Sequence, residues 1–227
     1  MPTDIPNVAD SNLEMSWFTF GGDYYEIYEA LVKAWCINMG LSTDEETVAK
    51  YFTISIEHKA VLDTVEGMKR KGFDVDVVDP DFSGRIRVED NISRIRPDTL
   101  LVSVMHVNNE TGIIQPVDEL GNELENRDIL FHVDATQSCG KLVDELRNLK
   151  YNMLSFSAHK LRGPQGVGVL VLKKKAYKFP PVKAIMYGGQ QEHRIRPGTI
   201  PVALVAGCGK ACEIAANEYK ENEKKLI

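Results

Sequence analysis

The chain has 227 residues, of which 43% are hydrophobic and 26% are charged, an ordinary balance for a soluble protein with one hydrophobic core. The net charge of −6 gives no basic stripe, so we expect no nucleic-acid partner. No apolar run approaches the ~20 residues of a membrane span, and the acidic N-terminus lacks a signal or transit pattern, so we expect no membrane partner and a cytoplasmic location.

Residues 1–16 hold no periodic apolar face, and we expect an irregular arm there. A short strand is predicted over 17–20, followed by the turn Gly21-Gly22-Asp23 and a helix over 24–39. A strand, a glycine pair and a helix N-terminus are typical of an anion cradle, but the Asp23 carboxylate would repel a phosphate. The turn is therefore open to two interpretations, an anion cradle and an ordinary strand-to-helix connection.

From residue 51 onward, short apolar runs alternate with stretches that repeat at helical spacing, which predicts βαβ units and a mostly parallel sheet. Strands are predicted over 51–56, 74–78, 100–106, 129–133 and 153–156, and helices from Val61, over 88–95 and over 117–126. A strand over 168–172 is expected to run antiparallel to the others, and a long helix begins at Val202.

Polar side chains follow two of these strands at their carboxyl ends. Asp134 follows the run 129–133, and Lys160 follows the run 153–156. Ligands of open α/β sheets sit outside the carboxyl ends of the strands, so both side chains should project into one crevice. An acid and a lysine suit pyridoxal phosphate, because a lysine forms a Schiff base with its aldehyde and an aspartate keeps its ring nitrogen protonated. Taken singly, Asp134 would be interpreted as a helix cap and Lys160 as a surface lysine.

The sequence segments around Asp134 and Lys160 are more specific than either residue alone. Five segments stand in this order: EHKAVLD from Glu57, VSVMHVNNETGIIQP from Val102, HVDATQS from His132, SFSAHKLRGPQGVG from Ser155 and GGQQEHRIRPGT from Gly188. Together they resemble the cysteine desulfurases, pyridoxal-phosphate enzymes of the class V aminotransferase family. The resemblance implies a fold type I large domain of the α/β class, a mostly parallel sheet with helices on both faces, over 17–205. A C-terminal helix over 206–227 is expected to follow it.

The resemblance also assigns roles to individual residues. It implies that Lys160 holds the cofactor and moves the substrate's α-proton, and that His58 stacks on the pyridine ring and handles protons. Without the resemblance, His58 would be a structural hydrogen-bonding residue. The cofactor-binding set that the resemblance implies is Asn109, Asp134, Gln137, Ser157, His159, Lys160 and Thr199.

Two members of this set have specific expected contacts. Asn109 is expected to contact the cofactor's phenolic oxygen together with Gln137, although amides at a strand end often make Asx turns instead. Thr199 is expected to reach the partner subunit's cofactor phosphate across a dimer interface; otherwise it belongs to a surface turn.

The implied activity is the conversion of L-cysteine to L-alanine, with the sulfur passed as a persulfide to an acceptor protein for iron–sulfur cluster or thio-cofactor synthesis. A selenocysteine lyase or another class V enzyme is the second enzyme interpretation. A hypothesis from another class is a non-catalytic subunit that pairs with a full-length homologue and lends Thr199 to its site. We expect a homodimer or a dimer with such a homologue.

The four cysteines form no CxxC pair, which argues against a zinc site and a disulfide framework. Cys208 and Cys212 lie on the buried stripe of the last helix, and Cys36 lies late in the predicted helix 24–39. A helix after Gln137 should carry Cys139 behind the cofactor. The resemblance implies that the persulfide-forming cysteine and the substrate-binding arginine belong to a small domain that we expect to lie outside this sequence.

Overall fold

The computed structural model describes residues 13–18, 50–70, 72–175, 179–182, 184 and 186–225. The predicted helix 24–39, the turn Gly21-Gly22-Asp23 and Cys36 lie outside the described residues. No helix in the described part of the chain is long and apolar enough to cross a membrane.

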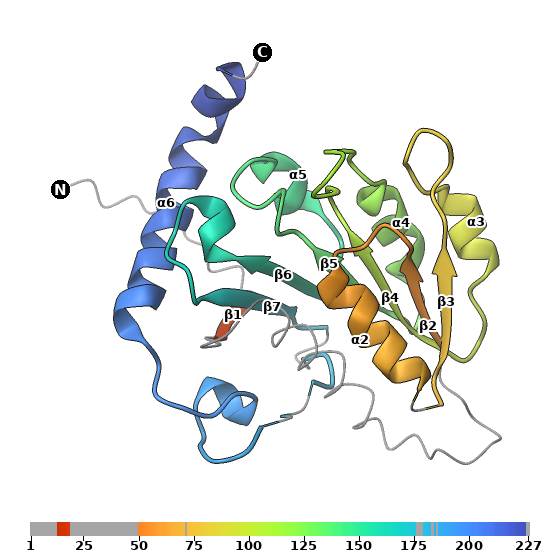
Figure 1. The fold of residues 1–227 in the computed structure, drawn as a ribbon, viewed down its shortest axis with the longest axis horizontal. Helices are drawn as coiled ribbons and strands as arrows, with labels where there is room; N and C mark the ends of the chain where they lie inside the picture. The colour runs from red at the N-terminus through yellow and green to blue at the C-terminus, as the bar shows by residue number, and fades with distance from the viewer. Residues whose placement is uncertain are drawn as a thin grey trace.

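Strands of the described residues form one seven-stranded sheet in the order β1-β7-β6-β5-β4-β2-β3 (Figure 1). Their bounds are β1 (Leu13–Phe18), β2 (Lys50–Ile54), β3 (Asp74–Val78), β4 (Thr99–Met105), β5 (Leu130–Asp134), β6 (Met153–Ser157) and β7 (Gly168–Lys173). Strands β2 to β6 pair in parallel, whereas β7 runs antiparallel to both of its neighbours. The predicted mostly parallel sheet and the antiparallel strand at 168–172 are confirmed.

Helices cover both faces of this sheet, as predicted for the α/β class. They are α2 (Lys59–Lys69), α3 (Val88–Ser93), α4 (Val117–Leu124), α5 (Val143–Asn148) and α6 (Val202–Lys224), with two short 3₁₀ turns, η1 (Ala158–Leu161) and η2 (Glu192–Arg194). The helix expected from Val202 therefore begins where predicted, and it crosses the boundary that we placed between 205 and 206.

The core divides at the sheet because successive strand residues point to opposite faces. On one face, α2 packs through Val61 and Val65 against a cluster that includes Tyr51 and Leu101. On the other face, α3, α4 and α5 pack over the alternate residues of the same strands, among them Phe131. Helix α6 packs over β6 and β7 through a third cluster. Two-sided burial explains why these strands are nearly continuous hydrophobic runs.

A polar ladder crosses the centre of the sheet. His132 on β5 lies between two serines, with its Nδ1 2.9 Å from Ser103 Oγ on β4 and its Nε2 3.0 Å from Ser155 Oγ on β6. Burial lowers the pKa of His132 to about 3, so the ring is neutral at pH 7. By strand alternation, His132 shares its face of the sheet with Asp134 and with Ser155.

Two boundaries differ from the sequence predictions. Strand β1 spans Leu13–Phe18 rather than 17–20, so residues 13–16 are not part of an irregular arm. Leu13, Met15 and Trp17 alternate with polar residues, a strand pattern that the nearby turn-forming residues obscured. The helix expected directly after Gln137 is a series of turns, and α5 begins only at Val143.

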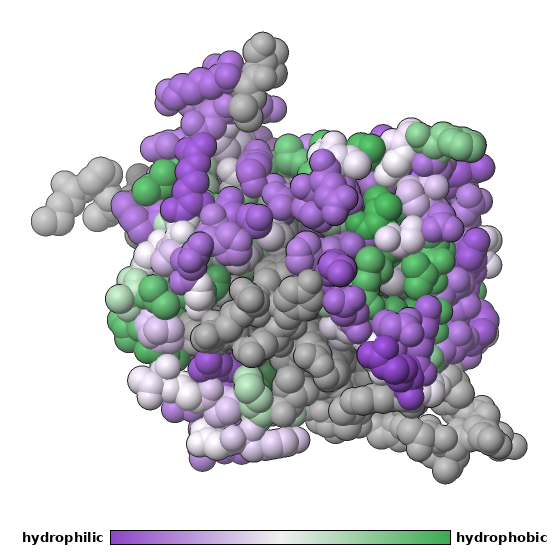
Figure 2. All heavy atoms as spheres, viewed as in Figure 1, coloured by the Kyte–Doolittle hydropathy of each residue, from purple (hydrophilic) through white to green (hydrophobic). Residues whose placement is uncertain are grey.

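Hydrophilic residues dominate the face of the molecule seen in Figure 2, and a hydrophobic patch lies over the loop between β3 and α3. Phe82 of this loop is fully exposed. Single exposed aromatic residues are common on soluble proteins, so we attach no role to this one.

Candidate cofactor site

The last residue of β5 anchors the site. Asp134 is 3% exposed, and its Oδ1 accepts the backbone N–H of Thr136 at 2.9 Å. The following turn is tied to the next strand, because Ala135 N–H donates to the Ser155 carbonyl at 2.9 Å. The carboxylate of Asp134 is therefore fixed at the carboxyl end of the sheet, where the sequence predicted it.

The end of β6 brings three more predicted residues to the same edge. Ser157 is buried, and its Oγ lies 2.8 Å from His159 Nδ1. His159 and Lys160 belong to η1 and are exposed to solvent. Burial, and then the charge of Lys160, lower the pKa of His159, so its ring is neutral at pH 7. Because β5 and β6 are paired neighbours, Asp134 and Lys160 follow adjacent strand ends as predicted.

His58 caps the helix that covers this face of the sheet. Its backbone is extended, with φ −60° and ψ 147°, and its Nδ1 accepts the N–H of Ala60 at 3.2 Å. In the neutral ring, an accepting Nδ1 leaves the proton on Nε2. The structural interpretation of His58 is thus confirmed, and its stacking on a cofactor stays a prediction.

The two asparagines after β4 divide the two roles that the sequence left open. Asn108 is buried and makes the Asx turn: its Oδ1 accepts the N–H of Thr111 at 2.8 Å, while its Nδ2 donates to the Ile56 carbonyl at 2.9 Å. Asn109 is exposed beside it. Asn108 carries the structural bonds, and the contact of Asn109 with a cofactor stays a prediction.

Gln137 is half-buried in the turn after Asp134, and its carbonyl accepts Lys141 Nζ at 2.7 Å. Thr199 is exposed and lies elsewhere, in the segment between η2 and α6. In Figure 1 this blue segment lies apart from the carboxyl ends of β5 and β6. The structure therefore does not bring Thr199 together with Asp134 and Lys160 of the same chain.

Glu57 is a site residue that sequence analysis missed. It is 5% exposed, and its Oε1 accepts the backbone N–H of Met105. Burial, and then the charge of Asp134, raise the pKa of Glu57 well above its usual range. An acid directly after the predicted strand 51–56 was the available signal, because charged residues are rarely buried without a specific reason.

A cavity of about 410 Å³ opens between α6 and the turn that follows β5. Its lining includes Cys139, Lys141, Lys160 and Tyr219. Turns replace the predicted helix after Gln137, and Cys139 packs against the cluster under α6 that holds Leu154 and Phe156, on the face of the sheet opposite Ser155. The expectation that Cys139 lies behind the cofactor stays a prediction. Burial raises the pKa of Cys139 to about 12, so its thiol is protonated at neutral pH.

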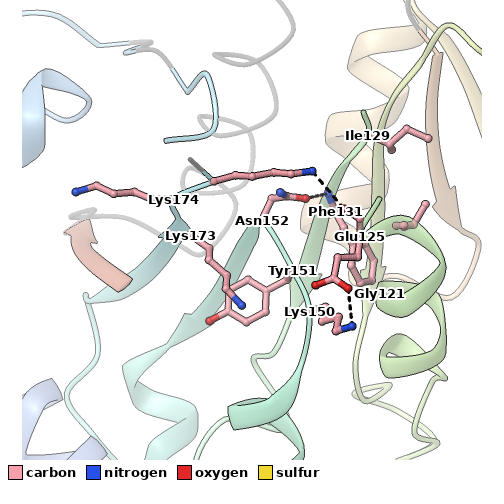
Figure 3. A pocket seen from close by; sticks show the side chains of 11 residues that line it. Gly121, Glu125, Ile129, Phe131, Lys150, Tyr151, Asn152, Lys173 and Lys174 are labelled. Atoms are coloured by element: carbon pink, nitrogen blue, oxygen red, sulfur yellow. Dashed lines mark hydrogen bonds and ion pairs between the residues drawn. The ribbon is translucent and has the colours of Figure 1, made fainter. Parts of the chain in front are cut away.

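A second, smaller pocket lies at the opposite edge of the sheet, near the start of β5 and β6 (Figure 3). Its lysines contact groups of the chain itself: Lys150 pairs with the Glu125 carboxylate, and Lys175 Nζ donates to the Glu125 carbonyl at 3.2 Å. Lys173 Nζ lies over the Tyr151 ring, 5.4 Å from its centroid. These contacts make the pocket a structural cluster remote from Asp134.

Comparison with known proteins identifies the family. Residues 36–226 match the model of the class V aminotransferases. This chain belongs to the class V aminotransferase family. Residues 1–60 also match the model of the DNA sulphur modification protein DndE. The two matched ranges overlap, and β1 belongs to the part that only the second model matches.

The relatives of the chain include proteins named as cysteine desulfurases. Cysteine desulfurase IscS of Haemophilus ducreyi is 45% identical over 174 residues, which are 77% of this chain and 42% of that protein. The crystal structure of DndA from Streptomyces lividans aligns with a TM-score of 0.81 and 40% identity over 91% of this chain and 57% of that one. A structure of SspA in complex with cysteine aligns with a TM-score of 0.76 and 35% identity over 88% and 55%. The chain thus spans about half the length of these relatives or less.

These families depend on pyridoxal phosphate, and the residues present fit it. Asp134 offers a buried carboxylate of the kind that holds a ring nitrogen, and the exposed amine of Lys160 follows the adjacent strand. The described residues contain no cluster of three or more His, Cys, Asp or Glu side chains that could hold a metal ion. The residues that fit the cofactor are thus a buried carboxylate and a lysine at the ends of two paired strands.

Proposed function

We propose that this chain is the cofactor-binding domain of a cysteine desulfurase. The observation that carries the proposal is the arrangement of Asp134 and Ser157 at two paired strand ends, with Lys160 in the turn that follows, in a chain 45% identical to a cysteine desulfurase. Because the chain spans 42% of that relative, the activity, the substrate and the partners all belong to the proposal.

Each residue has a distinct task in this proposal. Lys160 attaches the cofactor and moves the α-proton of the substrate. Asp134 keeps the ring nitrogen protonated, so that the bound cofactor supplies an electron sink. His58 uses its Nδ1 for the α2 cap, and its Nε2 exchanges a proton with the substrate's amine or thiol. Asn109 and Gln137 offer amides to the phenolic oxygen, and Ser157 and His159 complete the binding set.

L-cysteine is the proposed substrate, because relatives at 45% and 35% identity are named as a cysteine desulfurase and as a complex with cysteine. In this proposal the persulfide-forming cysteine comes from outside the described residues, because Cys139, Cys208 and Cys212 all pack in the cluster under α6. A dimer is part of the proposal, since the segment between η2 and α6 that carries Thr199 lies apart from the carboxyl ends of β5 and β6 and is available to the site of a partner.

One observation favours a destination for the sulfur other than iron–sulfur clusters or thio-cofactors. Residues 1–60 match the model of DndE, a DNA sulphur modification protein, and the DndA structure is 40% identical to this chain. We infer that the sulfur acceptor belongs to a DNA sulfur-modification system. The β1 strand lies within residues 1–60 and pairs with β7, so this segment is joined to the sheet that carries the site.

Cofactor attachment tests the site. The wild-type chain mixed with pyridoxal phosphate should gain visible absorption, and borohydride reduction should fix the cofactor on the peptide that contains Lys160. Lys160→Ala should lose both signals. Lys141→Ala is the matched control, because Lys141 lines the same cavity, and it should keep both. Attachment that survives in Lys160→Ala would overturn the assignment.

Isotope labelling tests the destination. Cells that carry the full gene should be grown with ³⁵S-labelled cysteine, and label should be measured in purified DNA and in the acid-labile sulfide of iron–sulfur proteins. We expect deletion of the gene to remove label from DNA and to leave it in iron–sulfur proteins. The opposite pattern would assign the chain to iron–sulfur cluster synthesis.

A further inference from the structure

We propose that Glu57 is a positioning residue of the cofactor site: its buried carboxyl group keeps a proton at neutral pH, so that Asp134 carries the single negative charge of the pair. The inference rests on the proposed function, which assigns Asp134 to the cofactor's ring nitrogen. Glu57 itself is not placed in contact with the cofactor.

The geometry begins where β2 stops pairing with β4, after Phe52. Glu57 continues the pairing with its side chain, because its Oε1 accepts the N–H of Met105 at the end of β4. On the other side of β4, Met105 is the register partner of Asp134, and the next residue, His106, donates its N–H to the Asp134 carbonyl at 2.9 Å. Both acids therefore border the same end of β4.

Burial decides the charge of this pair. Glu57 is 5% exposed and Asp134 is 3% exposed, and Oε2 of Glu57 has no hydrogen-bond partner among the described residues. Two neighbouring buried carboxyl groups titrate as a unit, and the second ionisation is strongly disfavoured. Both carboxyl groups accept one backbone N–H, Asp134 from Thr136 and Glu57 from Met105, so the difference between them is the Oε2 of Glu57, which no described group stabilises in its ionised form. The remaining proton thus belongs on Glu57.

The neighbouring titratable groups offer Glu57 little compensation. His106 directly follows the end of β4. Burial lowers the pKa of His106, even though the His106 Nε2 lies 3.3 Å from Glu145 Oε2. His58 follows Glu57 in the chain and uses its Nδ1 as an acceptor for the α2 cap. Among the described charged groups, Asp134 is the one whose charge acts on Glu57.

A simpler role for Glu57 would be to complete the hydrogen bonding of β4, and that role needs only the acceptor oxygen. Glu57→Gln separates the two, because glutamine keeps the acceptor for Met105 and supplies N–H donors in place of the acid proton, but it cannot titrate. Glu110→Gln is the matched control, since Glu110 is an exposed acid in the loop that follows β4.

The first measurement is urea unfolding of the cofactor-free chain between pH 5 and pH 8. If Glu57 holds a proton in the folded chain but not in the unfolded chain, the wild-type unfolding constant increases as the pH rises. Relative to Glu57→Gln, the increase is up to about tenfold per pH unit. Glu110→Gln should parallel the wild type. Parallel profiles for wild type and Glu57→Gln would overturn the proposal, because Glu57 would then hold no proton.

The second measurement is the dissociation constant for pyridoxal phosphate over the same range. A protonated ring nitrogen beside Asp134 favours loss of the Glu57 proton, so the wild-type affinity should rise with pH relative to Glu57→Gln. The unfolding constants of wild type and Glu57→Gln could diverge with pH while their cofactor affinities change in parallel. Glu57 would then be a buried structural acid, and the positioning role would be overturned. A wild-type chain that binds no cofactor would instead overturn the proposed function, while its unfolding profile would still report on the proton.

Discussion

Asp134 is the residue on which the charge of the site depends. It is buried at the end of β5 and is held by its own turn, so its carboxylate cannot move away from a ligand at the strand ends. A hydrogen bond to a charged partner contributes about 1.5–3 kcal/mol, which corresponds to a tenfold to hundredfold change in affinity.

We expect Asp134→Asn to fold normally but to bind pyridoxal phosphate at least tenfold more weakly, because the amide does not hold the ring nitrogen protonated. Exchange of the α-proton of a bound amino acid with deuterium, followed by NMR, should slow in parallel. Asp118→Asn, on the exposed side of α4, is the control. Unchanged exchange in Asp134→Asn would rule out the electron-sink role.

Single residues were predictable where their role depends on position along a strand. Asp134 and Lys160 follow apolar runs, so the sequence alone places them at the carboxyl edge. Glu57 was not predictable in this way, because its burial depends on a bond to Met105, 48 residues further along the chain. The choice between Asn108 and Asn109 was equally hidden, since it depends on the Ile56 carbonyl of another element.

At the scale of elements, the polar ladder makes the stability of the central strands depend on pH. His132 has a pKa of about 3 in the folded chain because of burial, whereas an exposed histidine titrates near 6.5. Between these two values the unfolded chain binds more protons than the folded one, so the free energy of unfolding falls as the pH falls below 6.5.

We expect this single group to remove about 2 kcal/mol of stability between pH 7 and pH 5. His132→Asn should be less stable at pH 7 but should lose less on acidification, as measured by urea unfolding. His193→Asn, in an exposed segment, should follow the wild type. If His132→Asn and the wild type lost stability equally, the ladder would not be the acid-sensitive element.

Strand prediction succeeded where apolar runs are uninterrupted. The strand predicted over 74–78 has the same bounds as the observed β3. The prediction was accurate because turns flank this valine-rich run on both sides. The turns after Gln137 were not predictable, because Gly140 there has φ +74°, and the space around it is filled by Leu161 and Ala215 from other elements. The tertiary contacts of this turn therefore override the helical pattern around Cys139.

At the scale of the whole molecule, the cysteines of the described residues, Cys139, Cys208 and Cys212, all pack in the cluster under α6, on the face of the sheet opposite Asp134. A sulfur nucleophile must reach within about 3–3.5 Å of the reacting atom and must be ionised. With a pKa of about 12, Cys139 is a thiolate in only about one molecule in ten thousand at pH 8. Cys208 is fully buried, and its hydrogen bond with Cys212 raises its pKa further.

We therefore expect little or no sulfide from L-cysteine when the chain is assayed alone with pyridoxal phosphate and a thiol reductant. Slow α-proton exchange through Lys160 should persist. The comparison is a variant in which Cys36, Cys139, Cys208 and Cys212 are all changed to serine, which should behave like the wild type. Strong turnover that only this variant loses would reveal a nucleophile within the chain.

The pairing of β1 with β7 sets a constraint on how the molecule is made. Leu13 is the register partner of Lys173, so the first described strand leaves the ribosome long before the strand that receives it. Until β1 docks, β7 exposes an unpaired edge, the part of a sheet most prone to wrong association. Pairings between distant segments also form slowly. Completion of this sheet edge must therefore wait until β7 has been synthesised, and nascent chains are most in need of a chaperone just before β1 docks.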